Sequence, residues 1–386
     1  MNSKKTAIIL GGGVGGLVTA NILRKLLPRQ HRVILIDREK DHLFLSSLLW
    51  LMIGKRKAEN ISRSLNLLSR KGIEVIQGEV DKIDPQTKKV VVSGREIAGD
   101  TIVISLGADL VFDAISGLKE AGHAICNLEG VQSISRDLCS FQGGRVAILT
   151  ATTMYKCPAA PYEAAMLVEC TFRQRGIRDK VQIDLYSAEP GPMGTAGPEI
   201  SAAVRQMVES KGIRYHPNYQ VTEVRAHEIK FSNGTSANFD LLLYVPPHRA
   251  PKVIKDCGLL ADSGWIAVDR HTLETGYKGV YAIGDVVSIP LKMGKPLPKA
   301  GVFAHGQAKV VAHNIAHEWT GKGATQSFDG FGQCFIEVGD NRAGIGSGNF
   351  YCEPMPKVTV KPPALRWHVL KVLFEKYWLR RWFPWT

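Results

Sequence analysis

The thiols of seven cysteines are the most reactive side chains in this sequence. They are Cys126, Cys139, Cys157, Cys170, Cys257, Cys334 and Cys352. Their number is odd and their spacing wide, and no C-x-x-C or Cys/His zinc spacing occurs, so neither a disulfide framework nor a metal site is expected. Most of them should be buried and inert. Cys157 differs, because it lies between Lys156 and Pro158 in a predicted loop, where a thiol can be accessible and reactive.

A strand, a glycine-rich turn and a helix are predicted at the start of the chain. Gly11 allows a tight bend, Gly13 lets the backbone approach a pyrophosphate, and Gly16 lets the helix pack on the strand. The helix start offers N–H groups and a positive dipole end to phosphates. Asp37 follows the next predicted strand and lies 21 residues after Gly16. An acid at this position can bind the ribose hydroxyls of a dinucleotide. The cofactor-binding residues predicted here are Gly11, Gly12, Gly13, Gly16, Asp37 and Arg38.

Two further segments favour FAD over NAD as the dinucleotide. Residues 101–108 form an apolar run that ends at Gly107, similar to the strand that crosses near the flavin in two-dinucleotide flavoproteins. Residues 280–285 end in Gly284-Asp285 and are similar to a second FAD signature, in which the aspartate meets the ribityl chain. We therefore predict one FAD.

A second strand–loop–helix unit begins at residues 145–150, where such flavoproteins usually bind NAD(P)H. The following residues, 151–163, contain no glycine and two prolines. Side chains would occupy the path that a pyrophosphate needs. Hydride donation from NAD(P)H is therefore not expected, and this loop contains Cys157 instead.

Strands that alternate with helices predict an α/β fold with two Rossmann-like units. We expect an FAD-binding domain over residues 1–110 and 265–330, and a second Rossmann-like domain over 111–264 that has lost its NAD site. Residues 331–386 should form an antiparallel strand pair and an amphipathic, membrane-associating helix that starts near residue 364.

These features resemble the sulfide:quinone oxidoreductases and flavocytochrome c sulfide dehydrogenase, within the two-dinucleotide-fold disulfide-reductase superfamily. The resemblance spans residues 6 to about 351 and is carried by five segments. They are residues 11–16 with Asp37, 157–163, 284–285, 297–303 and 333–339. It implies that Cys157 and Cys334 lie together at the flavin ring, with Cys126 as the counterpart of a third cysteine.

The resemblance also implies a reaction. Hydrosulfide would attack a Cys157–Cys334 bridge, leaving a persulfide and a thiolate, and two electrons would pass through FAD to a quinone. Lys299 and the helix that follows it would place positive charge near the flavin. Glu163 would act as a proton relay or as a first-turn acid of its helix. For the family's histidines the candidates are His123, His248 and His271.

Three alternatives to a quinone reductase stay open. The 157–163 loop is closer to the flavocytochrome pattern, which leaves a cytochrome as a possible electron acceptor. An NADH:quinone reductase is opposed by the glycine-free loop. A flavin redox sensor would use the same cysteines without turnover.

The charge and the C-terminus favour a membrane surface. The net charge is +13 without a nucleic-acid motif, so no nucleic acid is expected as a partner. On a helix over residues 364–386, Leu370, Phe374, Tyr377 and Trp378 share a face, with Lys371 and Lys376 off it. Trp367, Trp382 and Trp385 add interfacial aromatics.

The segment is too short and charged to span a bilayer, and no signal peptide is expected. We therefore predict a peripheral protein on the cytoplasmic side of the membrane. The alternative for this helix is packing on a partner subunit, as in a homo-oligomer.

Overall fold

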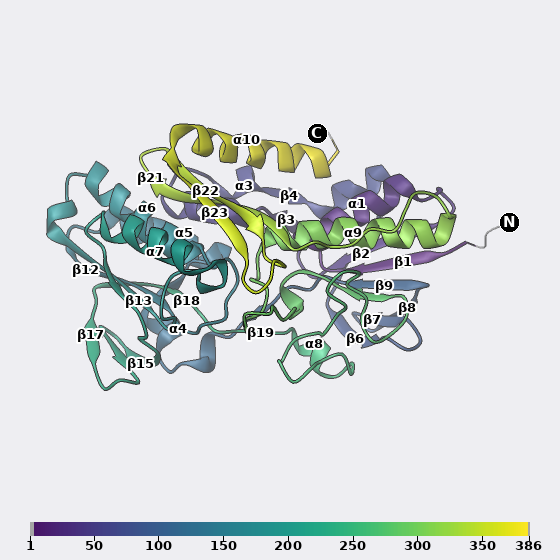
Figure 1. Cartoon of the computed structure of the whole chain (residues 1–386), viewed down its shortest axis with the longest axis horizontal. Helices are drawn as coiled ribbons and strands as arrows, with labels where there is room; N and C mark the ends of the chain where they lie inside the picture. The colour runs from purple at the N-terminus through teal and green to yellow at the C-terminus, as the bar shows by residue number, and fades with distance from the viewer. Residues whose placement is uncertain (1–3, 385–386) are drawn as a thin grey trace.

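The structure, a computed structural model, describes residues 4–384. Its first layer is a five-stranded sheet in the order β20-β9-β1-β2-β5, paired in parallel throughout. Its strands are β1 (Thr6–Leu10), β2 (Arg32–Asp37), β5 (Glu74–Gln77), β9 (Thr101–Ile104) and β20 (Val280–Ala282). Except for the edge strand β5, they are largely buried and apolar, as expected for parallel strands covered on both faces. Helices α1 (Val14–Leu26) and α9 (Gly301–Thr320) pack together on this sheet (Figure 1).

A second five-stranded parallel sheet has the order β11-β18-β12-β13-β14. Its strands are β11 (His123–Ala124), β12 (Gly144–Thr150), β13 (Val181–Ser187), β14 (Arg214–His216) and β18 (Leu241–Val245). Its helices are α5 (Leu128–Ser140), α6 (Ala160–Gln174) and α7 (Pro198–Glu209). The two sheets confirm the predicted α/β fold with Rossmann-like parallel sheets, while the domain boundaries stay a prediction.

Short strands and helices form the segments that connect the elements of the two parallel sheets. Two antiparallel sheets comprise β6 (Val80–Asp84), β7 (Lys89–Val92) and β8 (Arg95–Ala98), and β15 (Val221–Arg225), β16 (Glu228–Phe231) and β17 (Ser236–Asn238). Two short pairs join β3 (Asp41–Leu43) to β4 (Ser62–Ser64) and β10 (Asp109–Leu110) to β19 (His248–Arg249). The remaining short helices are α2 (Leu48–Met52), α3 (Ala58–Ile61), α4 (Leu118–Ala121) and α8 (Lys252–Lys255).

A third, antiparallel sheet joins the two Rossmann-like units. Strand β21 (Phe331–Gly339) pairs with β22 (Arg342–Asn349), as expected, and contacts both α6 and α9. The third strand, β23 (Lys357–Ala364), was not predicted, because the sequence indicated only a strand pair and a helix that starts near residue 364. Helix α10 (Leu365–Trp382) follows and crosses over this sheet toward α1 (Figure 1).

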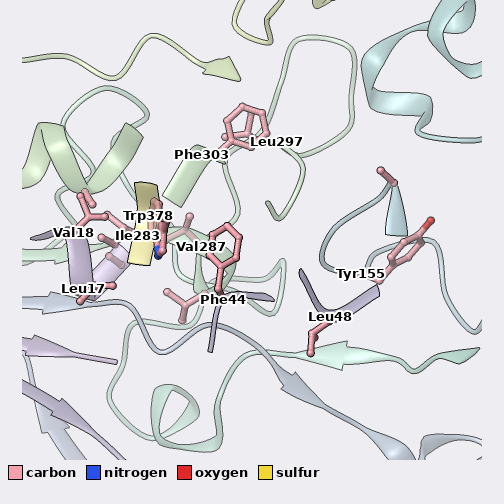
Figure 2. Packing of buried hydrophobic residues seen from close by; sticks show 14 of the residues in the cluster. Leu17, Val18, Phe44, Leu48, Tyr155, Ile283, Val287, Leu297, Phe303 and Trp378 are labelled. Carbon is pink, nitrogen blue, oxygen red and sulfur yellow. The ribbon is translucent and has the colours of Figure 1, made fainter. Parts of the chain in front are cut away.

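The prediction of which side chains α10 exposes to a membrane is wrong at two positions. Trp378 points into the protein, where it joins the buried cluster that contains Leu17, Phe44 and Ile283 (Figure 2). Lys371 is buried as well, because it pairs with acids of other elements. The face left exposed carries Leu365, Val369, Leu370, Leu373 and Tyr377. Trp385, which the sequence analysis placed in this helix, lies outside the described residues.

No helix in the part of the chain that the structure describes is long and apolar enough to cross a membrane.

Candidate active site

The glycine turn between β1 and α1 has the geometry of a phosphate cradle. Gly11 has a φ of +99°, and a Cβ there would collide with the Ser105 carbonyl. A Cβ on Gly16 would collide with the Gly11 carbonyl oxygen, so this close approach of helix and turn needs glycine. A Cβ on Gly13, by contrast, would meet no atom within 4 Å. The space beside Gly13 is therefore free for a ligand.

The polar groups around this turn fit a dinucleotide. Gly13 is the N-cap of α1 and provides no capping side chain, which leaves N–H groups of the first turn for a phosphate. Asp37 ends β2, and its carboxylate accepts hydrogen bonds from the Gly12 and Glu39 N–H groups. It thus holds the turn at the position where a ribose is expected. Arg38 lies at the surface beside Glu39 and Glu79, at 3.5 and 3.7 Å.

The two remaining FAD signatures lie at the ends of neighbouring strands, β9 and β20. Gly107 and Gly284 both have positive φ, +71° and +77°, which glycine adopts without strain. The Gly284 N–H donates to Oε1 of buried Gln307 at 2.7 Å. Burial raises the pKa of the Asp285 carboxyl, against the opposing effect of Lys156 and Lys299.

Lys299 is buried behind the second FAD signature and connects it to the segment before α9. Its ammonium donates to the carbonyls of Asp285 and Val287, at 2.7 and 2.9 Å, and lies 3.4 Å from the centre of the Trp265 ring. Burial lowers its pKa to about 8, with Asp285 acting in the opposite direction. Lys299 therefore holds the Asp285 loop through backbone atoms.

Cys157 lies in the loop between β12 and α6, in the position that a nucleotide-binding glycine turn would occupy. Its φ is +56°, in the left-handed region that non-glycine residues rarely adopt. The Cys157 N–H donates to the Lys299 carbonyl at 2.7 Å, and its own carbonyl accepts from the Ala160 N–H at 2.9 Å. The thiol is thus held beside the N-terminus of α9 by fixed backbone bonds.

Cys334 lies on β21, and its thiol lines the same cavity as Cys157. Both cysteines are free thiols in the structure. The cavity has a volume of about 370 Å³. Its other walls are largely apolar and include Phe303, Ile336, Phe350, Val358 and Val360. The fold thus brings two cysteines from distant parts of the chain to one apolar cavity.

Both thiols have raised pKa values. The Cys157 side chain is exposed to the cavity, yet desolvation by the surrounding protein raises the pKa of its thiol, with Cys334 and Glu163 adding to the effect. Burial raises the pKa of Cys334 to about 11, where Glu163 adds to the rise and Lys371 opposes it. A thiolate formed at either sulfur would therefore depend on nearby positive charge.

A buried ion cluster behind the cysteines was not found by sequence reasoning. Lys371 of α10 lies 3.1 Å from Glu163 of α6 and 4.0 Å from Glu337 of β21. Glu163 also accepts the Glu337 N–H at 2.8 Å, and Glu337 in turn binds His368 Nδ1 at 3.0 Å. All three charged side chains are buried. The sequence analysis placed Lys371 off the apolar face of this helix, because periodicity alone does not show that the face with Lys371, Glu375 and Trp378 is the buried one.

The pKa values within this cluster follow from burial and from opposite charges. Burial alone would lower the pKa of Lys371, but the Glu163 and Glu337 carboxylates raise it, so the lysine is charged. Burial raises the pKa of Glu163, although Lys371 and the Glu337 N–H oppose this. Because the lysine is already charged, Glu163 is the member of this pair that can gain a proton close to the cysteines.

Cys126 does not line the cavity that contains the other two cysteines. It lies just before α5, against the smaller buried cluster of the second unit. Burial raises its pKa to about 11, with the Lys156 ammonium opposing the rise. Its predicted role as a third redox cysteine stays a prediction.

The three candidate histidines lie in different places. His123 pairs with Asp137 at 2.9 Å, and His271 binds the Phe328 carbonyl. His248 binds the Pro246 carbonyl, and its Nε2 is buried without a partner among residues 4–384. Burial lowers its pKa to about 4, and Lys156 adds to the effect. Of the three, His248 is the one near the Lys156 and Lys299 ammonium groups.

At the position where a second nucleotide would bind, the acid expected to meet the ribose is already bonded within the protein. Strand β13 occupies the same place in the second unit as β2 in the first. Glu189, which follows β13, therefore corresponds to Asp37 and is the acid expected to meet a ribose. Its carboxylate instead accepts the Tyr155 hydroxyl at 2.7 Å. Tyr155, from the glycine-free loop, is buried. No group of residues that could hold a metal ion occurs in the described ranges.

Comparisons with known proteins agree with this geometry. The family model of the pyridine nucleotide-disulphide oxidoreductases matches residues 5–308. The chain is 28% identical to the sulfide-quinone reductase of Aquifex aeolicus over 97% of its own length and 90% of that protein. It is 28% identical to the mitochondrial sulfide:quinone oxidoreductase of Dictyostelium discoideum over 85% of its length and 74% of that protein.

A solved structure gives the same result in three dimensions. The X-ray structure of the Aquifex aeolicus sulfide:quinone oxidoreductase superimposes with a TM-score of 0.87, at 27% identity. The match covers 98% of this chain and 91% of that one. The likeness therefore includes the third sheet and α10 as well as the two Rossmann-like units.

Proposed function

The chain belongs to the pyridine nucleotide-disulphide oxidoreductase family, and we propose that it is a sulfide:quinone oxidoreductase with FAD as its cofactor. The observation that carries this proposal is the meeting of Cys157 and Cys334 in one cavity, where relatives that use NAD(P)H need a nucleotide-binding loop. The similarity to sulfide:quinone oxidoreductases over nearly the whole chain supports the same activity.

The chemistry starts from the oxidised cysteine pair. Hydrosulfide attacks one sulfur of a Cys157–Cys334 disulfide, so the S–S bond breaks, a persulfide forms on one cysteine and a thiolate on the other. A second hydrosulfide attacks the outer sulfur of the persulfide, which leaves as hydrodisulfide, the shortest polysulfide, while the cysteine departs as a thiolate. Both cysteines are then reduced, and their S–S bond would form again as two electrons pass to the bound FAD.

The bound FAD supplies two-electron transfer between the cysteine pair and the quinone. The residues that hold it are the glycine turn with Asp37, and the Gly107 and Gly284–Asp285 segments. Each turnover moves two electrons and two protons to a quinone, which becomes a quinol. Lys371 offsets negative charge at the cysteines, and Glu163 takes up or returns a proton close to them.

The proposed acceptor is a membrane quinone, and α10 offers a surface for the membrane, because it exposes an apolar stripe formed by Leu365, Val369, Leu370, Leu373 and Tyr377. Exposed basic residues lie on the same helix at Arg366, Lys376, Arg380 and Arg381. Exposed apolar residues together with cations suit an anionic lipid surface. We therefore infer peripheral binding to the cytoplasmic side of the membrane, with a second copy of the chain as the alternative occupant of the stripe.

The test is steady-state reduction of a short-chain quinone by purified, FAD-loaded protein. Sulfide should support turnover, and NADH should not, because the 151–163 loop contains no glycine and the Glu189 carboxylate is bonded to the Tyr155 hydroxyl. Reduction of a c-type cytochrome at a higher rate than the quinone would favour the cytochrome acceptor. Flavin reduction without turnover on either acceptor would favour a redox sensor.

A further inference from the structure

The C-terminal helix contacts the glycine turn through one histidine. His42, on β3, binds the Gly12 carbonyl through Nδ1 at 2.9 Å. Its Nε2 lies 3.1 Å from Trp378 Nε1 of α10. His42 and Trp378 are both buried. A chain of two hydrogen bonds therefore joins α10 to the turn that the proposed dinucleotide needs.

Only one form of His42 satisfies both contacts. An indole N–H is a donor and a carbonyl is an acceptor, so Nδ1 must donate to Gly12 and Nε2 must accept from Trp378. This is the neutral tautomer with its proton on Nδ1. Burial lowers the pKa of His42, with the Gly12 carbonyl and Asp37 opposing, which agrees with a neutral ring. Removing the Trp378 donor would leave a buried acceptor unsatisfied.

The orientation of the Gly12 carbonyl determines which way the Gly13 N–H points toward a phosphate. In a planar trans peptide, the carbonyl of one residue and the N–H of the next point in opposite directions. The hydrogen bond from His42 to the Gly12 oxygen therefore fixes the direction of the Gly13 N–H. The open space beside Gly13 is where a phosphate can approach.

The end of α10 is attached to the same Rossmann-like unit by a second contact. The Lys71 ammonium donates to the Trp382 carbonyl at 2.8 Å, which satisfies a carbonyl of the last helical turn. The same ammonium donates to Asn21 of α1 at 2.8 Å. The C-terminal half of α10 is thus held against the helix whose N-terminus faces the phosphate site.

We propose that Trp378 and His42 are positioning residues for the pyrophosphate of the dinucleotide, so that α10 forms part of the cofactor site. Binding of the dinucleotide and docking of α10 then strengthen each other by the same factor, because coupling between two binding events is reciprocal. This inference rests on the proposed FAD.

The experiment compares two tryptophans of α10. Trp378→Phe removes the donor to His42, whereas Trp382→Phe makes a similar cavity in the next turn without removing a bond to His42, since Trp382 Nε1 has no partner in the described chain. Apoprotein is titrated with FAD, and flavin fluorescence gives the Kd. We expect roughly a tenfold higher Kd for Trp378→Phe, the effect of one unsatisfied buried acceptor, and less than a twofold change for Trp382→Phe.

Equal FAD affinity in the two variants would overturn the inference. If Trp378→Phe does not fold, amide hydrogen exchange of the wild-type protein is measured with and without FAD. The inference predicts that FAD slows exchange in residues 365–382. Unchanged exchange in these residues would overturn it. Wild-type protein that binds no FAD would overturn both this inference and the proposed function. Coupling between FAD and α10 in a protein inactive with sulfide would overturn the proposed function alone.

Discussion

Lys371 of the C-terminal helix and Glu163 of the Cys157 loop–helix unit form a buried ion pair of 3.1 Å. The pair lies behind the two cysteines, and its members act in opposite directions on the pKa of Cys334. The helix that exposes an apolar stripe to the outside thus contributes a cation to the proposed redox site. The proposed membrane docking and the proposed thiol chemistry would therefore both depend on this helix.

Loss of Lys371 should destabilise the protein strongly. Lys371→Met leaves Glu163 buried without its cation, which typically costs about 3–5 kcal/mol of unfolding free energy. The double variant Glu163→Gln/Lys371→Met removes both charges and should recover much of this loss. Denaturant unfolding compares the wild-type protein, Lys371→Met, Glu163→Gln and the double variant, and Lys376→Met, at an exposed lysine of the same helix, is the control. Additive effects of the two substitutions would contradict a coupled pair.

The reduced cysteines should react slowly with alkylating reagents at neutral pH. The pKa of Cys334 is about 11, so its thiolate fraction, and with it the alkylation rate, should increase about tenfold per pH unit below that value. Mass spectrometry of anaerobically reduced protein, resolved by peptide, separates Cys334 from exposed Cys139. A Cys334 profile that levels off below pH 9 would show a thiolate more stable than this structure allows.

Two glycine substitutions in one turn should have different effects. Gly13→Ala adds a methyl group where the protein leaves room, so the protein should fold normally but lose FAD. Gly16→Ala forces a methyl group onto the Gly11 carbonyl and should lower the thermal unfolding midpoint. Flavin absorbance and melting curves measure the two effects. Full FAD retention in folded Gly13→Ala would place the dinucleotide elsewhere.

The stripe on α10 should determine membrane binding. Leu370→Glu and Leu373→Glu together remove two exposed leucines, each worth about 1.5–3 kcal/mol on full burial, so partition onto anionic vesicles should fall at least roughly tenfold. Leu260→Glu changes an exposed leucine outside this helix and serves as the control. Unchanged vesicle binding, accompanied by a smaller assembly in solution, would instead assign the stripe to a partner subunit.

The predictable parts of this protein are those that depend on local sequence. The glycine turn needs Gly11 and Gly16 for reasons of backbone geometry, and Asp37 follows at a fixed distance along the chain, so these features were evident before the structure. The meeting of Cys157 and Cys334 was implied by the resemblance alone. No local pattern could place a loop cysteine and a strand cysteine, so distant in sequence, in one cavity.

The unpredicted parts depend on partners that are distant in sequence. Periodicity shows that α10 has two faces, but not which one is buried. Lys371 turns inward because Glu163 and Glu337 provide opposite charges, and Trp378 turns inward because His42 accepts its N–H. Strand β23 was missed because its pairing with β22 outweighs the prolines at its end.

The most direct test of the account is anaerobic reduction of the bound flavin. Sulfide should bleach the flavin absorbance of the wild-type protein and of Cys139→Ser, whereas NADH should not. Cys157→Ser and Cys334→Ser should keep a yellow, folded protein that sulfide no longer bleaches at a comparable rate. Bleaching by NADH alone, or undiminished bleaching by sulfide in Cys157→Ser, would contradict sulfide oxidation through this cysteine pair.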